Sequence, residues 1–150
     1  MIELPKDNVM AFDPGKNTGV VEVENGAVVN AQTTMIESLM AGAPRNFIFR
    51  LKEKDYVVVE DFRLYPSNPR TDAVLYPVKA MTIIELEAQK AGQPLTYQYA
   101  GDVKSYATNN RLREAGWWGE LAGDHQRDAA RHALFLLVQK ASDPQEDNDG

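Results

Sequence analysis

Residues 9–23 read VMAFDPGKNTGVVEV, and this stretch decides the fold. The short apolar run Val9–Phe12 ends at Asp13, and a second largely apolar run, Val20–Val23, follows a turn that contains two glycines. Because Asp and Gly are poor strand residues, the pattern predicts strand, turn and strand, with Asp13 where the first strand stops. A carboxylate there can point into an open cleft. The common alternative is an Asp that starts a turn by accepting hydrogen bonds from backbone amides.

The rest of the chain predicts a mixed sheet covered by helices, an α/β arrangement. The turn Asn25-Gly26 would pair the second strand with a third over Ala27–Thr33 as an antiparallel hairpin. The β-branched run in Tyr56–Val59 is typical of a buried central strand, and it ends at Glu60-Asp61. Four more elements are expected: a helix from Thr71 or Asp72 to Ala91 that kinks or starts later at Pro77, a strand over Leu95–Tyr99, a short helix over Asp102–Asn110 and a final helix over His125–Ala141 capped by Asp124.

The composition is that of a globular chain with one core. At 150 residues, with 43% apolar and 25% charged residues, the chain is long enough for one domain, expected over residues 1–141. It has no apolar run long enough to span a membrane, and residues 1–7 lack the apolar region of a signal peptide. A cytoplasmic location, in a bacterial host if the chain is phage-encoded, is therefore expected.

The net charge of −6 argues only weakly against nucleic-acid binding. Residues 142–150 hold four acids and no base, so they carry four of the six net negative charges. This composition predicts a disordered acidic tail. Several of the remaining acids are candidate metal ligands, whose charge bound cations would neutralise.

Three acidic clusters lie at the ends of expected elements: Asp13, Glu60-Asp61 and residues 124–128. Three such clusters are the minimum set for a divalent-metal site. The absence of cysteine excludes thiolate zinc and iron–sulfur sites. Oxygen ligands and at most two histidines remain, which favours a hard ion such as Mg²⁺ or Mn²⁺.

The strand-end acids are not equivalent. Side chains alternate along a strand, so only one of Glu60 and Asp61 can share a face with Asp13. Glu60 is the favoured partner, and Asp61 would point away or support the site from behind. As an alternative, Glu60 and Asp61 are two solvated acids at a strand end.

On the final helix, His125, Asp128 and His132 share a face because they are spaced three and four residues apart. His125 could be a metal ligand, a general base or an ordinary first-turn residue. Asp128 could be a ligand, or an acid favoured by the helix dipole. His132 is more simply explained as a packed or capping histidine, and Asp124 as the helix cap.

Two further features have open interpretations. The pair Trp117-Trp118 could form a hydrophobic lid under the final helix or a surface on which bases stack. In the first turn, Lys16 and Thr18 could contact phosphate, and Gly19 is expected to serve the turn geometry.

Five segments carry a resemblance to a known family. They are FDPGKNTGVVEV (12–23), VVVEDF (57–62), NPRTDAVLYPVKAM (68–81), PLTYQYAGDVKSYAT (94–108) and DHQRDAARHAL (124–134). In this order they resemble the motifs of the RuvC-type Holliday-junction resolvases, within the ribonuclease H-like superfamily. The resemblance implies a ribonuclease H-like mixed five-stranded sheet flanked by helices. Small phage-encoded members of the family are similar in size and acidity.

The resemblance also implies a set of catalytic residues. Asp13, Glu60 and Asp128 would be carboxylate ligands, and His125 the fourth ligand, of two Mg²⁺ or Mn²⁺ ions in each active site. Lys104, within the Val-Lys match, would contact the phosphate or the scissile strand. The implied reaction is two-metal hydrolysis of a phosphodiester, with no small-molecule cofactor.

The implied partner is branched DNA, above all a four-way Holliday junction. Symmetric cuts in such a junction need two active sites, so a homodimer is expected. The basic residues expected to contact DNA are Lys16, Arg63, Arg70, Lys79 and Lys104. Three alternatives remain: a ribonuclease H-like nuclease with another DNA or RNA substrate, a non-catalytic junction-binding protein, and an actin-like phosphotransferase, which would need two such domains.

Overall fold

The computed structural model describes residues 3–41, 47–62, 66–67 and 71–142. Its elements, in chain order, are β1 (Val9–Asp13), β2 (Asn17–Glu24), β3 (Ala27–Met35), α1 (Ile36–Met40), α2 (Phe47–Lys52), β4 (Tyr56–Asp61), α3 (Asp72–Ala91), β5 (Leu95–Tyr99), α4 (Ala100–Tyr106), α5 (Asn109–Glu114), the 3₁₀ turn η1 (Trp118–Glu120) and α6 (Gly123–Ser142). Within the described ranges, no helix is both long and apolar enough to cross a membrane.

The five strands form one mixed sheet in the order β3-β2-β1-β4-β5. β1 pairs antiparallel with β2 and parallel with β4, and β4 pairs parallel with β5. The hairpin between β2 and β3 turns at Asn25 and Gly26, both with positive φ, as a two-residue primed turn requires. The predicted mixed five-stranded sheet is therefore confirmed, and the β1–turn–β2 unit lies at its centre.

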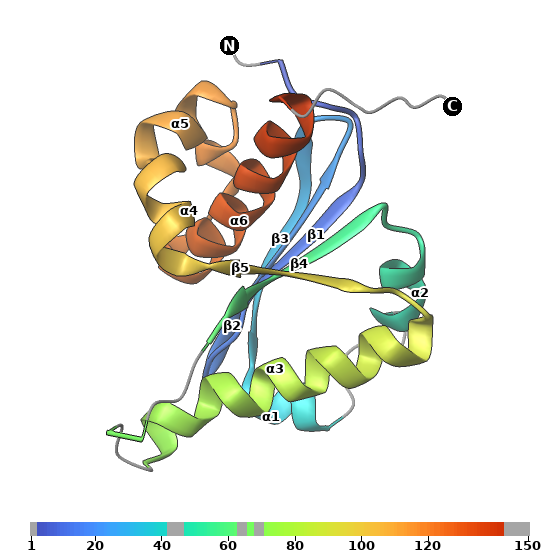
Figure 1. Cartoon of the computed structure of the whole chain (residues 1–150), viewed down its shortest axis with the longest axis vertical. Helices are drawn as coiled ribbons and strands as arrows, with labels where there is room; N and C mark the ends of the chain where they lie inside the picture. The colour runs from blue at the N-terminus through green and yellow to red at the C-terminus, as the bar shows by residue number, and fades with distance from the viewer. Residues whose placement is uncertain (1–2, 42–46, 63–65, 68–70, 143–150) are drawn as a thin grey trace.

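Helices cover both faces of this sheet (Figure 1). On one face, Val9 and Ala11 of β1 and Val58 of β4 pack in one apolar cluster with α4, α5 and α6. On the other, Met10 and Phe12 join a cluster with α2 and α3. The alternation along β1 continues to Asp13, which therefore belongs to the α6 face.

Most predicted elements are confirmed, and two details are wrong. Helix α3 runs from Asp72 through Pro77 to Ala91, and Gly92 ends it in the left-handed conformation. The single short helix expected over Asp102–Asn110 is instead two helices, α4 and α5. The chain leaves the helix at Ala107, and the Thr108 side chain caps α5 by accepting a hydrogen bond from the amide of Arg111.

The second correction concerns the start of the final helix. Helix α6 already includes Gly123, so Asp124 lies in its first turn and is not its cap. Instead, the Gln126 side chain reaches back, and its Oε1 accepts a hydrogen bond of 2.9 Å from the amide of Ala122. Asp124 is left exposed, 3.6 Å from the Arg127 guanidinium.

The two tryptophans have different roles. Trp117 is buried in the cluster beneath α6, and its Nε1 donates a hydrogen bond of 2.9 Å to the carbonyl of Gly26. The hydrophobic-lid interpretation is therefore confirmed for Trp117. Trp118 is half-buried, and the guanidinium groups of Arg113 and Arg127 lie 4.2 Å and 4.3 Å from its ring centroid. These cations already contact the indole of Trp118.

Candidate active site

Asp13 and Glu60 lie at the carboxyl ends of adjacent parallel strands. Val59 packs on the α3 side of the sheet and Val58 on the α6 side, so alternation places Glu60 on the α6 face with Asp13. Asp61 falls on the opposite side, where its charge adds to burial and to the hydrogen-bonded Glu85 carboxylate in raising the pKa of Tyr97. The sheet thus presents one carboxylate from each of β1 and β4 to the first turns of α6.

A close backbone contact brings α6 to this edge of the sheet. Gly19 is the β2 partner of Asp13, and a Cβ atom built on it would lie 1.9 Å from the carbonyl oxygen of His125. Gly19 lies within β2 and is not among the residues with positive φ, so the expectation that it serves the turn is wrong. A missing side chain at Gly19 lets the first turn of α6 lie against β2, one turn before Asp128.

The electrostatics of Asp13 show that the three carboxylates affect one another. Burial, followed by the negative charges of Glu60 and Asp128, raises the pKa of Asp13 to about 8, and Lys104 partly offsets this rise. A carboxyl group with this pKa is largely protonated at neutral pH, and Asp13 hydrogen-bonds with Glu60. The acids of β1, β4 and α6 therefore share one electrostatic environment.

Glu60 shifts in the opposite direction. Its burial favours the neutral acid, but hydrogen bonds from His132 and Asp13 and the positive charges of His132 and Lys104 outweigh burial and lower its pKa. The Nε2 atom of His132 lies 2.9 Å from Glu60 Oε1. Glu60 is thus the ionised partner and Asp13 the protonated one.

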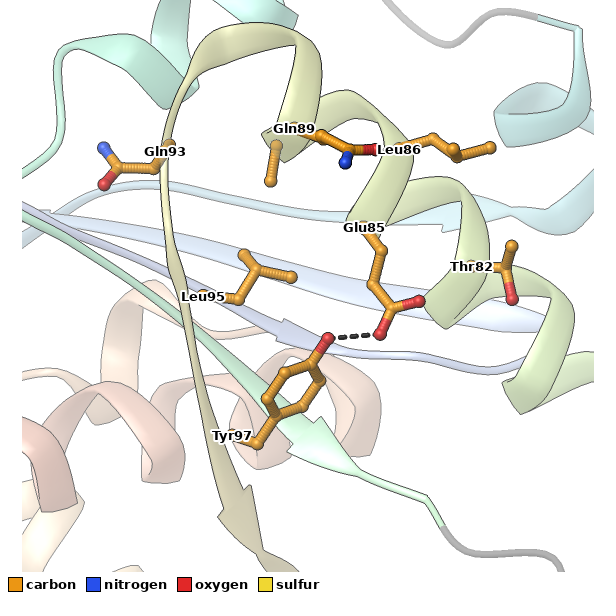
Figure 2. A pocket seen from close by; sticks show the side chains of 8 residues that line it. Thr82, Glu85, Leu86, Gln89, Gln93, Leu95 and Tyr97 are labelled. Carbon is orange, nitrogen blue, oxygen red and sulfur yellow. Dashed lines mark hydrogen bonds between the residues drawn. The ribbon is translucent and has the colours of Figure 1, made fainter.

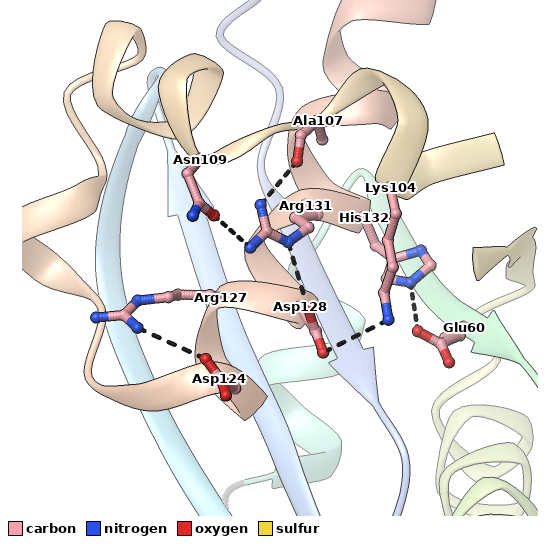
Figure 3. Close-up of polar contacts among 9 residues, drawn as sticks. All are labelled: Glu60, Lys104, Ala107, Asn109, Asp124, Arg127, Asp128, Arg131 and His132. Carbon is pink, nitrogen blue, oxygen red and sulfur yellow. Dashed lines mark hydrogen bonds and ion pairs between the residues drawn. The ribbon is translucent and has the colours of Figure 1, made fainter. Parts of the chain in front are cut away.

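Basic side chains surround Asp128 (Figure 3). Lys104 on α4 places Nζ 4.0 Å from Asp128 Oδ2, and Arg131 places Nε 3.3 Å from Oδ1. Arg131 also donates hydrogen bonds of 2.8 Å to the Ala107 carbonyl and 2.7 Å to Asn109 Oδ1. One guanidinium therefore ties Asp128 to the connection between α4 and α5.

Comparisons with known proteins agree with this architecture. No family model matches the chain, and no curated protein matches it. Among solved structures, T. thermophilus RuvC in complex with Holliday junction substrate superposes with a TM-score of 0.67 at 17% identity, covering 91% of this chain and 97% of that one. A Thermus thermophilus RuvC structure gives 0.57 at 20% identity, covering 89% and 96%. The chain has the RuvC fold. The resemblance suggested by the sequence is confirmed at the level of the fold.

The RuvC fold does not bring every predicted site residue into contact. His125 has an exposed side chain, and its backbone carbonyl makes the close approach to Gly19. Thr18 is fully buried, and its hydroxyl bonds both the amide and the carbonyl of Gly15 at 3.3 Å, so it braces the turn. A phosphate-contacting role for Thr18 does not fit this burial.

The predicted DNA contacts that the structure describes form two groups. Lys16 in the first turn and Lys79 on α3 both lie near the Tyr76 ring, at 5.9 Å and 5.8 Å from its centroid. Lys104 is on α4, which packs on the other face of the sheet, next to Asp128. The predicted contacts Arg63 and Arg70 lie outside the described residues.

Two hollows of similar volume differ in their relation to the site. A polar cleft of about 420 Å³ opens beside Asp128, lined by Lys104, Thr108, Asn109, Asp124 and Arg131. A second hollow of about 450 Å³ lies between α3 and β5, where Tyr97 donates a hydrogen bond to Glu85 (Figure 2). The carboxylates of Asp13, Glu60 and Asp128 do not line the second hollow, so only the first adjoins the candidate site.

The donor set suits a hard divalent cation, although the side chains do not yet enclose one. Asp13, Glu60 and Asp128 supply the carboxylate oxygens that Mg²⁺ and Mn²⁺ favour. Among the described residues, no group of three or more such ligands stands in an arrangement that could already hold a metal. Instead, Lys104, Arg131 and His132 contact Glu60 and Asp128. Burial, followed by the charges of Glu60 and Asp128, still raises the pKa of Asp13, and Lys104 only partly offsets this rise.

Sequence analysis missed two residues that contact the acids of the site. Arg131, three residues after Asp128, was not singled out, although an i,i+3 pair with an acid is a recognisable signal. His132 was placed on the correct helix face but explained as packing. Its contact with Glu60 spans 72 residues of sequence, so local spacing could not reveal it.

Proposed function

We propose that this chain is a hydrolase, a divalent-metal-dependent endonuclease that cleaves four-way or other branched DNA junctions. The observation that carries the proposal is the meeting of Asp13 and Glu60, at the ends of adjacent parallel strands on one face of a RuvC fold, with Asp128 on α6. Burial, followed by the charges of Glu60 and Asp128, raises the pKa of Asp13, and strongly shifted carboxyl pKa values cluster at functional sites.

The metal ligands in this proposal are Asp13, Glu60 and Asp128, with His125 as the fourth. Two Mg²⁺ or Mn²⁺ ions held there would lower the pKa of a water nucleophile and stabilise the negative charge on the leaving 3′ oxygen. The products would carry 5′ phosphate and 3′ hydroxyl groups.

The chain's own residues prepare this chemistry. Asp13 holds a proton at neutral pH in the metal-free protein, so it must release that proton before it can act as a ligand. Lys104, with a side chain that is 55% exposed and 4.0 Å from Asp128, can turn toward a phosphate when Asp128 is otherwise neutralised. Arg131 keeps Asp128 oriented from the opposite side.

Branched DNA is the proposed substrate because the fold is shared with a protein bound to such DNA and because a lysine lies at the carboxylates. Lys104 lies 4.0 Å from Asp128, and Lys16 and Lys79 gather around Tyr76. The T. thermophilus protein that shares this fold is in complex with Holliday junction substrate. Paired cuts in a junction require two active sites, and we therefore propose a homodimer with two-fold symmetry.

The decisive experiment is cleavage of a labelled four-way junction, beside duplex and single-stranded DNA of matched sequence. Wild type and Asp13→Asn are each tested with Mg²⁺, Mn²⁺ or EDTA. Paired nicks across the junction that need metal and disappear in Asp13→Asn are expected. Light scattering at the same protein concentrations should report a dimer.

The other outcomes correspond to the alternative functions. Equal cutting of all substrates, or of RNA, would replace the resolvase with a general ribonuclease H-like nuclease. Tight junction binding without cutting in any metal would favour a non-catalytic junction-binding protein. Tight ATP binding would favour the phosphotransferase.

A further inference from the structure

His132 lies where it can orient Glu60. It is 1% exposed, one turn beyond Asp128 on α6, and its two ring nitrogens each face an oxygen at 2.9 Å: Nε2 faces Glu60 Oε1 and Nδ1 faces Gln98 Oε1. Glu60 and Gln98 are register partners on β4 and β5. The imidazole thus spans two neighbouring strands at one level of the sheet.

We propose that Gln98 and His132 form a positioning relay that fixes the Glu60 carboxylate for metal binding. The inference rests on the proposed function, because it assigns to the relay the orientation of one proposed ligand. His132 and Gln98 would not touch metal or DNA themselves, so they are positioning residues and not catalytic ones.

The hydrogen-bond pattern requires His132 to donate to Glu60. An ionised carboxylate only accepts hydrogen bonds, so the Nε2 atom of His132 must carry a proton. Gln98 is buried, and its amide nitrogen has no hydrogen-bond partner among the described residues. Turning that amide over would let its N–H donate to Nδ1 of a neutral His132; with the amide unturned, Nδ1 also carries a proton and donates to Oε1. In both arrangements Gln98 braces the ring and Glu60 receives an N–H.

The relay has a consequence for the geometry of the site. Glu60 has three rotatable side-chain bonds, and an unrestrained glutamate loses conformational freedom when it binds a ligand. With Oε1 held by His132, the carboxylate is already directed toward Asp13, with which it also hydrogen-bonds. Hydrogen-bonded partners behind a metal ligand typically contribute 10- to 100-fold to metal affinity.

Simple packing does not account for this arrangement. The neighbours of His132 on α6, Ala129, Ala133 and Leu136, are apolar and buried, and an apolar side chain would fill the same space without a polar cost. A buried imidazole whose two nitrogens both face polar groups, on β4 and β5, instead indicates that His132 is present for these hydrogen bonds.

The test uses the full chain and two variants of one position. His132→Phe keeps a planar ring but removes the donor, whereas His132→Gln keeps an amide N–H near the place of Nε2. Mn²⁺ affinity is measured by calorimetry on the protein alone, and junction cleavage is measured across a range of Mg²⁺ concentrations. Thermal melting in EDTA checks that each variant is folded.

The expected result is a loss of about 10- to 100-fold in Mn²⁺ affinity for His132→Phe. The Mg²⁺ concentration for half-maximal cleavage should rise by the same factor, and saturating Mg²⁺ should restore the rate. His132→Gln should recover most of the affinity. In a Glu60→Gln background, His132→Phe should cause no further loss of Mn²⁺ affinity, because the carboxylate that His132 orients has already been removed.

Gln98→Leu provides a second route if His132→Phe does not fold, and it should also weaken Mn²⁺ binding, by a smaller factor. Folded His132→Phe or Gln98→Leu with the wild-type Mn²⁺ affinity and Mg²⁺ dependence would overturn the relay while leaving the nuclease intact. An equal loss in the Glu60→Gln background would overturn it as well. A wild type that neither binds Mn²⁺ nor cuts DNA would overturn both the relay and the proposed function.

Discussion

Asp13 destabilises the metal-free protein at neutral pH. Its pKa rises from an ordinary value of 3.8 to about 8 on folding, so the folded state binds more protons than the unfolded state between these values. The free energy of unfolding therefore falls as pH rises from about 4 to about 8. Asp13→Asn removes this effect, so its melting temperature in EDTA should exceed that of wild type by a margin that grows across this range. For a chain of this length, each kcal/mol of added stability raises the melting temperature by about 2–4 °C.

Mn²⁺ provides the control for the Asp13 prediction. Metal should stabilise wild type, by about 2.7 kcal/mol at 100 times its Kd, and should leave Asp13→Asn little changed. A difference in melting temperature between the two proteins that stays constant from pH 5 to pH 8 in EDTA would contradict the prediction. It would mean that Asp13 keeps an ordinary pKa.

Arg131 is expected to stabilise the fold because its guanidinium donates several hydrogen bonds at once. It bonds Asp128 on α6 and, at the connection between α4 and α5, the Ala107 carbonyl and the Asn109 side chain. A lysine keeps the charge but cannot reach three acceptors at once. Arg131→Met should lower the free energy of unfolding by about 1–3 kcal/mol, measured by urea denaturation, and Arg131→Lys should recover little of this loss.

A matched surface substitution separates the Arg131 effect from that of net charge. Lys52→Met removes one positive charge from an exposed position at the end of α2, and it should change stability by less than about 0.5 kcal/mol. Full recovery of stability in Arg131→Lys would mean that charge alone matters at position 131.

The packing of α6 on the sheet depends on one absent side chain. A Cβ at Gly19 would lie 1.9 Å and 2.4 Å from the carbonyl oxygen and carbon of His125. These are backbone atoms, so no change of side-chain rotamer can relieve the clash. Gly19→Ala should therefore push the first turn of α6 away from β2, destabilise the fold by about 1–3 kcal/mol or more, and weaken Mn²⁺ binding because Asp128 moves with the helix. Thermal melting and calorimetry measure the two effects.

Gly119→Ala is the control for this contact. In the part of the chain that the structure describes, no heavy atom lies within 4 Å of a Cβ built on Gly119, and its φ is not positive, so the same substitution should be nearly neutral there. Equal effects of Gly19→Ala and Gly119→Ala would show that the helix has room to adapt. Lost stability with unchanged Mn²⁺ affinity would show that Gly19 matters for packing but not for the site.

The helices and strands could be predicted better than their arrangement. Contacts such as that of Gly19 with His125 join residues far apart in the sequence, and local patterns do not show them. The run Tyr56–Val59 and the helix ending at Gly92 follow from local chemistry: a β-branched stretch, and a glycine that takes up positive φ. The break at Ala107 was not predicted, because Thr108 was not recognised as the cap of a new helix, although Thr is a preferred N-cap residue. Asp124 was assigned as a cap from its residue type, whereas the Gln126 side chain provides the hydrogen bond.

For the candidate site, strand alternation predicted that only one of Glu60 and Asp61 shares a face with Asp13, and the observed pairing of β1 with β4 confirms the favoured Glu60. The bonds from His132 to Glu60 and from Arg131 to Ala107 depend on how α6 crosses the sheet, and no local period encodes that crossing. The expected roles of Asp13, Glu60, Asp128, His125 and Lys104 in metal binding and cleavage stay predictions.

The whole molecule combines a net negative charge with basic residues beside its candidate site. Lys104 lies beside Asp128, and Lys16 and Lys79 lie together near the Tyr76 ring. The net charge of −6 would oppose the approach of DNA, but four of these charges come from the terminal stretch 142–150. Added salt should therefore weaken the long-range repulsion between DNA and the acidic residues more than the direct contacts between DNA and the lysines.

Removing residues 143–150 should tighten junction binding at low salt. The deletion removes four acids, and at about 0.01 M salt, where charges act over about 30 Å, the Kd should fall roughly 2- to 5-fold, the range for surface charges worth up to about 1 kcal/mol. The difference should shrink as added salt screens these charges. A chain of full length with the four acids changed to Asn or Gln should behave like the deletion if charge is the cause. Equal Kd values for wild type and both variants at low salt, measured by fluorescence anisotropy, would mean that the terminal acids do not oppose DNA.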